Sequence, residues 1–419
     1  MKLTVTKTGP LKGAVCVPAD KSICHRALLL AAMCEGPSTI KGISPGLDVE
    51  ATIAFICGLG ISVERTGANA VVHPGTMAMS GDFDCGNSGT TMRLGIGSVA
   101  SLPGPFRFTG DPSLVTRPMA RVAQPLREMG AEVELSARGT APVLVNGGPL
   151  TGIEHTPAVA SAQVKSAVLI AGLRAEGTTT VTEPTPTRDH TERLLASIGA
   201  PIRRTFSKVS VSRWDRGSGF DLEVPGDISS AAYLIAAATL VPGSVVEITG
   251  VGLNPTRTGF IEVMRSMGAD IETTIDSEEP EPVGRVVVKA SHLLGVEVGA
   301  ELVPGCIDEL PLLILMASVA EGKSVISGAG ELRFKESDRL SAMARCLRTF
   351  GTKFEETSDG MVIEGGDLEG GSISSMGDHR IALTMAIAGL VSKEAVSIDG
   401  WEAADVSYPG LPGDLRELG

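Results

Sequence analysis

The sequence predicts an α/β fold built from repeated segments, each with two helices and several strands. Two observations support this prediction. A helix that ends at glycine and is followed by a strand recurs at intervals of about 70 residues, with one longer step. A second helix type alternates with the first and tends to be followed by a β-rich segment. The two patterns divide the whole chain into six repeats.

The first helix type ends at a glycine that we expect in the left-handed conformation, where a side chain would be strained. These glycines are Gly60, Gly130, Gly199, Gly268 and Gly351. Residues 415–419 form another such helix end without a strand after it, whereas residues 2–6 read as just such a strand. We therefore expect a circular repeat, in which the first strand completes the last repeat and the termini are close. Chance recurrence of glycine at helix ends is the alternative.

The second helix type begins at polar residues, which by themselves are ordinary N-caps. These starts lie at 20–22, 87–90, 161–163, 227–230, 308–309 and 378–380. Lys21 and Arg380 differ from ordinary caps, because a cation at a helix N-terminus opposes the helix dipole. Both are explained if an anion lies between the cation and the helix end, where backbone N–H groups already favour negative charge.

More cations stand near the starts of the first helix type. They are Arg117, Arg188, Arg257, Arg333, Lys335 and Arg339. Lys335 and Arg339 are four residues apart and should share a helix face, as should Ser22 and Arg26. Taken singly, each is more often a solvated surface charge. Gathered at equivalent helix ends in a chain of net charge −13, they predict a small, strongly anionic substrate pair.

Composition sets the class of protein. The 419 residues are 43% hydrophobic and 20% charged, enough for two or three domains with aliphatic cores. The acidic balance argues against nucleic acid or anionic membranes as partners. The seven cysteines contain no Cys-x-x-Cys pair, which disfavours a disulfide framework or zinc site. Residues 1–5 lack a signal-peptide core and the apolar run 310–320 is too short to span a bilayer, so we expect a cytoplasmic protein.

Six short motifs, in order along the chain, carry a resemblance to a known family. They are 18–26 (Pro-Ala-Asp-Lys-Ser-Ile-Cys-His-Arg), 86–93 (Gly-Asn-Ser-Gly-Thr-Thr-Met-Arg), 161–166 (Ser-Ala-Gln-Val-Lys-Ser), 188–192 (Arg-Asp-His-Thr-Glu), 333–339 (Arg-Phe-Lys-Glu-Ser-Asp-Arg) and 377–380 (Gly-Asp-His-Arg). Together they resemble the 5-enolpyruvylshikimate-3-phosphate synthases, in particular their second bacterial class. Each motif alone is a weak signal, but six occur in order, and the resemblance runs from residue 18 to residue 408.

The resemblance implies a two-domain inside-out α/β barrel of six βαβαββ-type repeats, three per domain. One domain would comprise residues 1–19 and 227–419, the other residues 20–226, with the active site in the cleft between them. The implied reaction belongs to the shikimate pathway of aromatic amino acid biosynthesis. The 5-hydroxyl of shikimate-3-phosphate attacks C2 of phosphoenolpyruvate while C3 is protonated, and the resulting ketal then loses phosphate. No metal or cofactor is implied, and a monomer is expected because one chain builds the site.

The resemblance also assigns the site residues. Shikimate-3-phosphate would be held by Lys21, Ser22, Arg26, Ser161, Ala162, Gln163, Arg188, Asp308 and Lys335. Phosphoenolpyruvate would be held by Lys21, Asn87, Gly89, Arg117, Gln163, Arg339, His379 and Arg380. Asp308 would take the proton from the 5-hydroxyl, while Glu336 and Lys21 would manage the proton on C3. Simpler explanations are that Asp308 only caps its helix and that Glu336 only pairs with a neighbouring cation.

Some positions depart from the family pattern. Cys24 and Ala19 stand where serine and glycine are usual, and no lysine precedes Ser407, which puts one phosphoenolpyruvate contact in doubt. Gly89 implies inhibition by glyphosate, which occupies the phosphoenolpyruvate position.

Two alternatives stay open. An enolpyruvyl transferase acting on UDP-N-acetylglucosamine typically has Lys-Asn where this chain has Lys21-Ser22, and a loop cysteine that residues 101–105 lack. A silent anion-binding scaffold would be weakened by Asp308 and Glu336.

Overall fold

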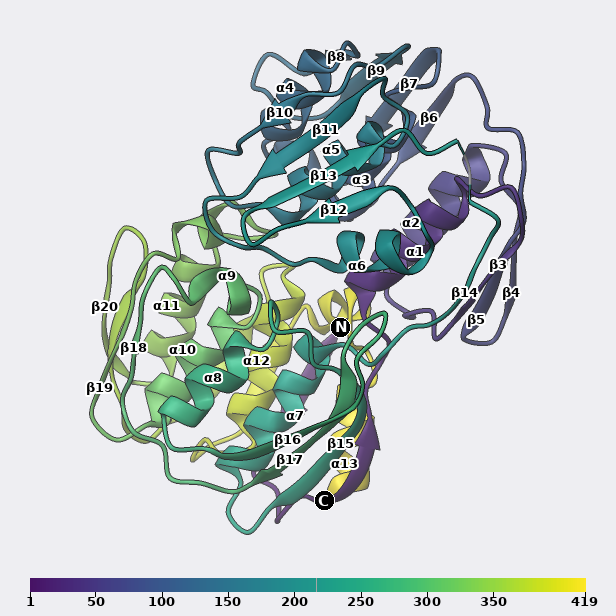
Figure 1. Cartoon of the computed structure of the whole chain (residues 1–419). Coiled ribbons are helices and arrows are strands. Elements are labelled where there is room, and N and C mark those ends of the chain that lie inside the picture. The colour runs from purple at the N-terminus through teal and green to yellow at the C-terminus, as the bar shows by residue number, and fades with distance from the viewer. Residues whose placement is uncertain (216) are drawn as a thin grey trace. The chain divides into compact units, whose positions relative to one another are not determined.

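The computed structural model describes residues 1–215 and 217–419 (Figure 1). The chain divides into two compact units, each with its own hydrophobic core. The first unit comprises Met1–Pro18, Pro225–Glu278 and Pro282–Gly419, and the second comprises Ala19–Val224 with Glu279–Glu281. The domains expected from the sequence, 1–19 with 227–419 and 20–226, differ from these units by one or two residues at the borders and by residues 279–281.

The second unit contains three four-stranded sheets and six helices among its described residues. In hydrogen-bonding order the sheets are β14 (Asp221–Glu223), β3 (Ser38–Lys41), β5 (Asn69–Val72), β4 (Val63–Thr66); β6 (Gly81–Asp84), β7 (Gly104–Thr109), β9 (Val143–Gly147), β8 (Glu132–Glu134); and β10 (Glu154–His155), β11 (Thr178–Thr182), β13 (Lys208–Ser212), β12 (Ile202–Arg204). The helices are α1 (Lys21–Ala31), α2 (Leu47–Gly58), α3 (Gly89–Val99), α4 (Ala120–Glu128), α5 (Ala162–Gly172) and α6 (His190–Ser197), with the 3-10 turn η1 (Leu114–Thr116).

The first unit repeats this arrangement with one shortened sheet. Its sheets are β16 (Asp270–Ser277), β17 (Val283–Lys289), β15 (Val245–Gly252), β2 (Lys12–Cys16); β18 (Glu297–Val298), β19 (Lys323–Ile326), β21 (Met361–Glu364), β20 (Lys353–Glu356); and β1 (Lys2–Val5), β23 (Val396–Asp399), β22 (Gly371–Ser374). Its helices are α7 (Ile228–Leu240), α8 (Gly259–Ser266), α9 (Val303–Cys306), α10 (Leu310–Val319), α11 (Arg339–Thr349), α12 (His379–Gly389) and α13 (Leu411–Leu418), with the 3-10 turns η2 (Gly330–Phe334) and η3 (Trp401–Val406).

The N-terminal strand completes the last repeat, as the sequence predicted. Strand β1 pairs antiparallel with β23, with Lys2 opposite Asp399. Its place in the sheet differs from the prediction, however. In the fifth repeat, for example, β20 and β21 form a hairpin, and its second strand, β21, pairs antiparallel with β19. Strand β1 pairs in the same way with β23, so it takes the place of the second hairpin strand and not that of the strand directly after a helix. The sixth sheet therefore has three strands, and helix α13 ends with Gly419 beside Thr8 and Leu11.

The glycines at the ends of the first helix type adopt the predicted left-handed conformation. Their φ angles are 87° at Gly60, 112° at Gly130, 74° at Gly199, 95° at Gly268 and 74° at Gly351. Each follows a helix and precedes a strand that forms the edge of its sheet, from β4 in the first repeat to β20 in the fifth. The turn therefore reverses the chain where a residue with Cβ would be strained.

The second helix type forms the interior of each unit. Every residue of α12 is buried, and so is every residue of α7 except the last. Small residues allow this packing: a Cβ on Gly97 of α3 would lie 2.5 Å from the carbonyl oxygen of Ala167 in α5. Because these helices are enclosed, their N-terminal ends are where polar side chains gather. Among the described residues, none of the helices has the length and apolar character needed to cross a bilayer.

Candidate active site

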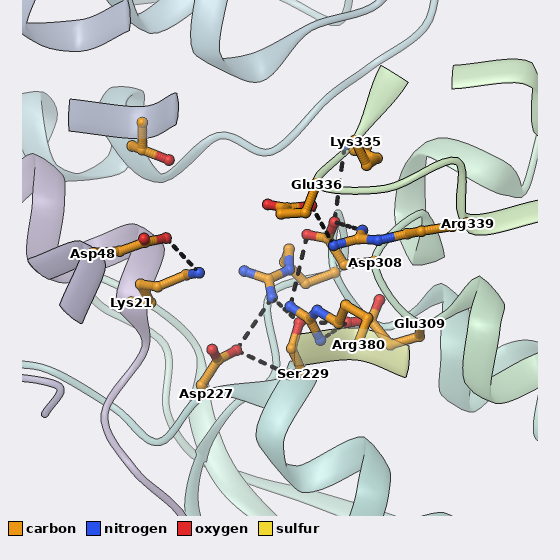
Figure 2. A network of polar contacts seen from close by, with 12 residues as sticks. Lys21, Asp48, Asp227, Ser229, Asp308, Glu309, Lys335, Glu336, Arg339 and Arg380 are labelled. Carbon is orange, nitrogen blue, oxygen red and sulfur yellow. Dashed lines mark hydrogen bonds and ion pairs between the residues drawn. The ribbon is translucent and has the colours of Figure 1, made fainter. Parts of the chain in front are cut away.

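In the first unit, three cations surround the carboxylate of Asp308 (Figure 2). Asp308 Oδ1 lies 3.5 Å from Arg339 Nη1 and 3.9 Å from Lys335 Nζ. Asp308 Oδ2 lies 3.9 Å from Arg380 Nη2. These residues come from the starts of α10, α11 and α12, so helix starts of the fifth and sixth repeats supply one cluster.

Arg339 is the most firmly held member of this cluster. It is 1% exposed, and its Nε donates to Asp378 Oδ2 at 2.9 Å while its Nη2 donates to Glu336 Oε2 at 2.5 Å. Burial alone would lower the pKa of Arg339, but the carboxylates of Asp378, Glu336 and Asp308 raise it overall. The guanidinium is therefore a permanent charge that orients three carboxylates.

The expectation that Lys335 and Arg339 share a helix face is wrong. Helix α11 begins at Arg339, because the side chain of Asp338 caps it by accepting a hydrogen bond from Ser341 N at 3.1 Å. Lys335 lies before this cap, at the end of the 3-10 turn η2. The two side chains nevertheless converge, since both approach the same oxygen of Asp308.

Arg380 lies in the first turn of α12, where its backbone N–H donates to the N-cap Asp378 at 2.9 Å. Its side chain is 5% exposed and faces Asp308, Glu309 and the phenol of Tyr233. Burial raises the pKa of Tyr233 to about 12, although Arg380 opposes the shift, so the phenol stays protonated at neutral pH. The neighbouring His379 is also buried, with 2% exposed.

Helix capping does not account for the position of the Asp308 carboxylate. The N-cap of α10 is Glu309, one residue later, and Asp308 faces the three cations described above. Glu336 does pair with a neighbouring cation, Arg339, as the simpler explanation for it supposed.

In the second unit, Lys21 is the first residue of α1 and pairs with a carboxylate that the sequence did not reveal. Its Nζ lies 2.8 Å from Asp48 Oδ2, and Asp48 stands in the first turn of α2 (Figure 2). The N-cap Asp20 accepts a hydrogen bond from Ile23 N at 2.9 Å. Protein carboxylates thus supply negative charge near this helix end, where the sequence predicted an anion.

Arg26 is buried more deeply in the second unit than a ligand-binding side chain at the surface would be. It is 2% exposed, and its Nε donates to Thr191 Oγ1 at 2.8 Å and its Nη2 to Ser166 Oγ at 2.9 Å. Its Nη1 donates to the carbonyl oxygen of Ser22 at 2.9 Å, which confirms that Ser22 and Arg26 share a helix face. These bonds tie α1 to α5 and α6.

A second group of polar side chains surrounds the start of α3. Arg117 Nη2 donates to Asn87 Oδ1 at 2.6 Å and to Ser113 Oγ at 3.1 Å. Arg93 Nη1 donates to Gln163 Oε1 at 2.7 Å. Gly89 lies between the two guanidinium groups, because a Cβ there would be 2.7 Å from Arg93 Nη1 and 3.3 Å from Arg117 Nη1.

The remaining expected ligands lie at the starts of α5 and α6. Ser161 is the N-cap of α5, and its hydroxyl accepts a hydrogen bond from Val164 N at 3.3 Å. Ala162 is the first residue of that helix. Arg188 is partly exposed just before α6. Each unit therefore gathers its own share of the expected site residues.

Several polar residues of these clusters were not expected as site residues. They are Asp48, Arg93, Asp227, Ser229, Glu309 and Asp378. Asp227 and Asp378 could have been found, since both occupy the helix starts that the repeat defines. Asp48 gives no comparable signal, because it stands at the start of the other helix type. Within the described residues, no group of three or more His, Cys, Asp or Glu side chains is arranged to hold a metal ion.

Comparison with known proteins identifies relatives along the whole chain. A model of the EPSP synthase family, 3-phosphoshikimate 1-carboxyvinyltransferase, matches residues 5–415. The 3-phosphoshikimate 1-carboxyvinyltransferase of Halorhodospira halophila is 48% identical over 99% of this chain and 95% of the relative. The enzyme of that name from Bacillus subtilis is 43% identical over 98% of both chains.

Solved structures give the same result for the fold. The EPSP synthase of Acinetobacter baumannii superposes with a TM-score of 0.87, at 39% identity, over 100% of this chain and 98% of the other. The enolpyruvyl transferase NikO of Streptomyces tendae reaches a TM-score of 0.82 at 18% identity, over 100% of this chain and 97% of the other, which speaks for the fold alone. The predicted two-domain α/β fold is confirmed. The full-length match and the identity of the relatives show that this chain belongs to the EPSP synthase family of 3-phosphoshikimate 1-carboxyvinyltransferases.

Proposed function

We propose that this chain transfers the enolpyruvyl group of phosphoenolpyruvate to the 5-hydroxyl of shikimate-3-phosphate, using Asp308, Glu336 and Lys21 for proton transfer. Residues of both units would take part in binding the two substrates. The 5-hydroxyl attacks C2 while C3 gains a proton, and the ketal then loses phosphate and a C3 proton. This route needs an acid and a base whose roles exchange, together with charge neutralisation.

The observation that best supports the proposal is the carboxylate of Asp308 among Arg339, Lys335 and Arg380. An ionised carboxylate is the form that pairs with these cations, and it is also the form that can accept a proton from a hydroxyl group. The same cations can bind the anionic groups of the substrates, so that the base and the reacting hydroxyl are held together. Arg339 and Arg380 would bind phosphoenolpyruvate with His379, and Lys335 would bind shikimate-3-phosphate.

The cluster of the second unit suits the binding of anions. Arg117, with Asn87 and the backbone of Gly89, would bind phosphoenolpyruvate, because guanidinium groups grip phosphate and carboxylate with paired donors. Shikimate-3-phosphate would lie against the starts of α1, α5 and α6. The residues assigned to it there are Ser22, Arg26, Ser161, Ala162, Gln163 and Arg188.

Two groups would manage the proton on C3. Glu336 is held by Arg339 at 2.5 Å, and Lys21 by Asp48 at 2.8 Å, so each has a fixed orientation and a charged partner. We place Lys21 in contact with both substrates and Glu336 as the partner that removes the C3 proton when phosphate leaves.

Phosphate release tests the proposal. The purified chain is mixed with phosphoenolpyruvate and either shikimate-3-phosphate or UDP-N-acetylglucosamine, and free phosphate is followed over time. We expect phosphate release when the acceptor is shikimate-3-phosphate, and none when it is UDP-N-acetylglucosamine. Release only with the UDP-sugar would make the chain a transferase of the other substrate class, and no release with either would leave an anion-binding scaffold.

The remaining parts of the proposal concern partners and location. The acidic chain, with net charge −13, would work in the cytoplasm as a monomer and without nucleic acid. Light scattering of the purified chain tests the monomer, since a mass near 43.2 kDa is expected.

A further inference from the structure

The N-cap of helix α10 differs from the N-caps of the other five interior helices. In α1, α3, α5, α7 and α12 the N-cap side chain accepts a hydrogen bond from a backbone N–H of the first turn. In α10 the N-cap is Glu309, whose side chain makes no such bond to the described backbone. Helix capping therefore does not explain a glutamate at this position.

The Glu309 side chain lies in the interior of the first unit, with 3% exposed. Its Oε1 accepts a hydrogen bond from Ser229 Oγ, the second residue of α7, and lies 3.6 Å from Arg380 Nη1 in α12. One carboxylate thus joins the starts of three helices that belong to three different repeats (Figure 2).

The hydroxyl group of Ser229 donates its hydrogen bond in a defined direction. Arg257 Nη2 donates to Ser229 Oγ at 2.7 Å and lies 3.2 Å from Asp227 Oδ1. Because Ser229 accepts from Arg257, its own proton goes to Glu309. A continuous chain of buried contacts therefore leads from Arg257 through Ser229 to Glu309 and ends at Arg380.

Arg380 is held between two adjacent carboxylates. Its Nη1 faces Glu309 at 3.6 Å, and its Nη2 faces Asp308 at 3.9 Å. A buried guanidinium needs nearby negative charge, so without the charge of Glu309 it would be drawn towards Asp308. Arg380 would then pair with the carboxylate of Asp308, which the proposed mechanism uses as a base.

We propose that Glu309 is a positioning residue, which fixes the Arg380 guanidinium for phosphoenolpyruvate and keeps it from closing onto Asp308. This inference rests on the proposed function, because it assumes that Arg380 binds phosphoenolpyruvate. Glu309 itself touches no substrate and acts only through Arg380.

The Glu309→Gln variant tests this role. Glutamine keeps the length of the side chain and can still accept the hydrogen bond from Ser229, but it has no charge for Arg380. We expect KM for phosphoenolpyruvate to rise about tenfold, and KM for shikimate-3-phosphate to change less than about twofold. Equal changes in the two KM values, or a lower melting temperature with both KM values unchanged, would overturn the inference.

Two further variants complete the experiment. Glu356→Gln is the matched control, since it makes the same substitution in the same unit but removes charge beside Arg333, 3.1 Å away; both of its KM values should stay as in the unmodified chain. If Glu309→Gln does not fold, Ser229→Ala decides, because it removes the donor to Glu309 and should raise KM for phosphoenolpyruvate about threefold. An unmodified chain without activity contradicts the proposed function, whereas an active chain whose variants show no selective change contradicts only the role of Glu309.

Discussion

Arg339 in the first unit and Arg117 in the second are both buried, with 1% and 6% exposed, but they are held by different partners. Arg339 contacts the carboxylates of Asp378 and Glu336. Arg117 donates to the amide oxygen of Asn87 and the hydroxyl of Ser113. The same contrast separates Arg380, which faces two carboxylates, from Arg26, which donates to two hydroxyl groups.

The difference indicates a division of work between the two clusters. A contact with a hydroxyl or amide oxygen cancels less of the charge of a guanidinium than a contact with a carboxylate does, which favours binding of an anion. Contacts with carboxylates cancel much of that charge but hold each carboxylate in a fixed place. We therefore expect the second unit to contribute chiefly to binding of the anionic substrates, and the first to contribute chiefly to proton transfer. Lys21, which pairs with Asp48, is an exception among the expected site residues of the second unit.

The largest expected effect concerns the base of the first unit. Asp308→Asn keeps the shape of the side chain but removes its ability to accept a proton, so kcat should fall by about 10²–10⁴-fold. Binding of shikimate-3-phosphate, measured by calorimetry, should change much less. A variant with kcat within about threefold of the unmodified value would contradict the proposal that the first unit contributes chiefly to proton transfer.

Replacing Arg339 and Arg117 in turn tests most directly how the partners of a buried arginine differ between the two units. Arg339→Ala leaves Asp378, which is 0% exposed, without its cation, and should lower the free energy of unfolding by about 3–5 kcal/mol. Arg117→Ala removes the donor to the amide oxygen of Asn87 and the hydroxyl of Ser113, and should lower it by about 1 kcal/mol while raising KM for phosphoenolpyruvate. Denaturant unfolding of the two variants measures both values, and equal losses of stability would contradict the comparison.

Much of this arrangement could be predicted from the sequence, for a physical reason. Asp308 and Arg380 are far apart in the chain, but they occupy equivalent helix starts in successive repeats, and repetition brings equivalent ends together. The circular closure of the fold was predictable in the same way. The place of β1 was not, because both strands of a hairpin carry the same kind of sequence.

The pairing of charges was the part that the sequence could not supply. Lys21 was expected to need an anion, but only the tertiary structure brings Asp48 to 2.8 Å of it. Likewise, the spacing of Lys335 and Arg339 suggested one helix, whereas the cap at Asp338 starts the helix later. Spacing describes neighbours within an element, whereas these contacts depend on packing between elements and on local capping.

A moderate effect is expected at Gly89 in the second unit. In Gly89→Ala the new methyl group would lie 2.7 Å from Arg93 Nη1 and 3.3 Å from Arg117 Nη1, so both guanidinium groups must move. We expect KM for phosphoenolpyruvate to rise about tenfold and inhibition by glyphosate to weaken, since both ligands would use this position. The unmodified chain should be inhibited by glyphosate, and normal turnover of that chain at millimolar glyphosate would contradict this prediction.

The smallest expected effect concerns a buried histidine beside the cations of the second unit. His25 is 0% exposed, and burial, followed by the charges of Lys21 and Arg26, lowers its pKa well below 6.5, while Asp20 opposes the shift. As the pH falls below 6.5, the unfolded chain therefore binds a proton that the folded chain does not, and stability is lost. At pH 5.5 this loss should be about 1.4 kcal/mol relative to pH 7.5.

His25→Gln should remove that part of the pH dependence. The substitution also affects the contact of His25 Nδ1 with Thr52 Oγ1, 2.6 Å away, but this contribution shifts stability at both pH values alike. The informative quantity is therefore the difference between denaturant unfolding at pH 7.5 and pH 5.5, compared between the variant and the unmodified chain. If the two chains lose the same stability over this range, His25 is protonated in the folded state. Burial and the neighbouring cations Lys21 and Arg26 would then not lower the pKa of His25 as described.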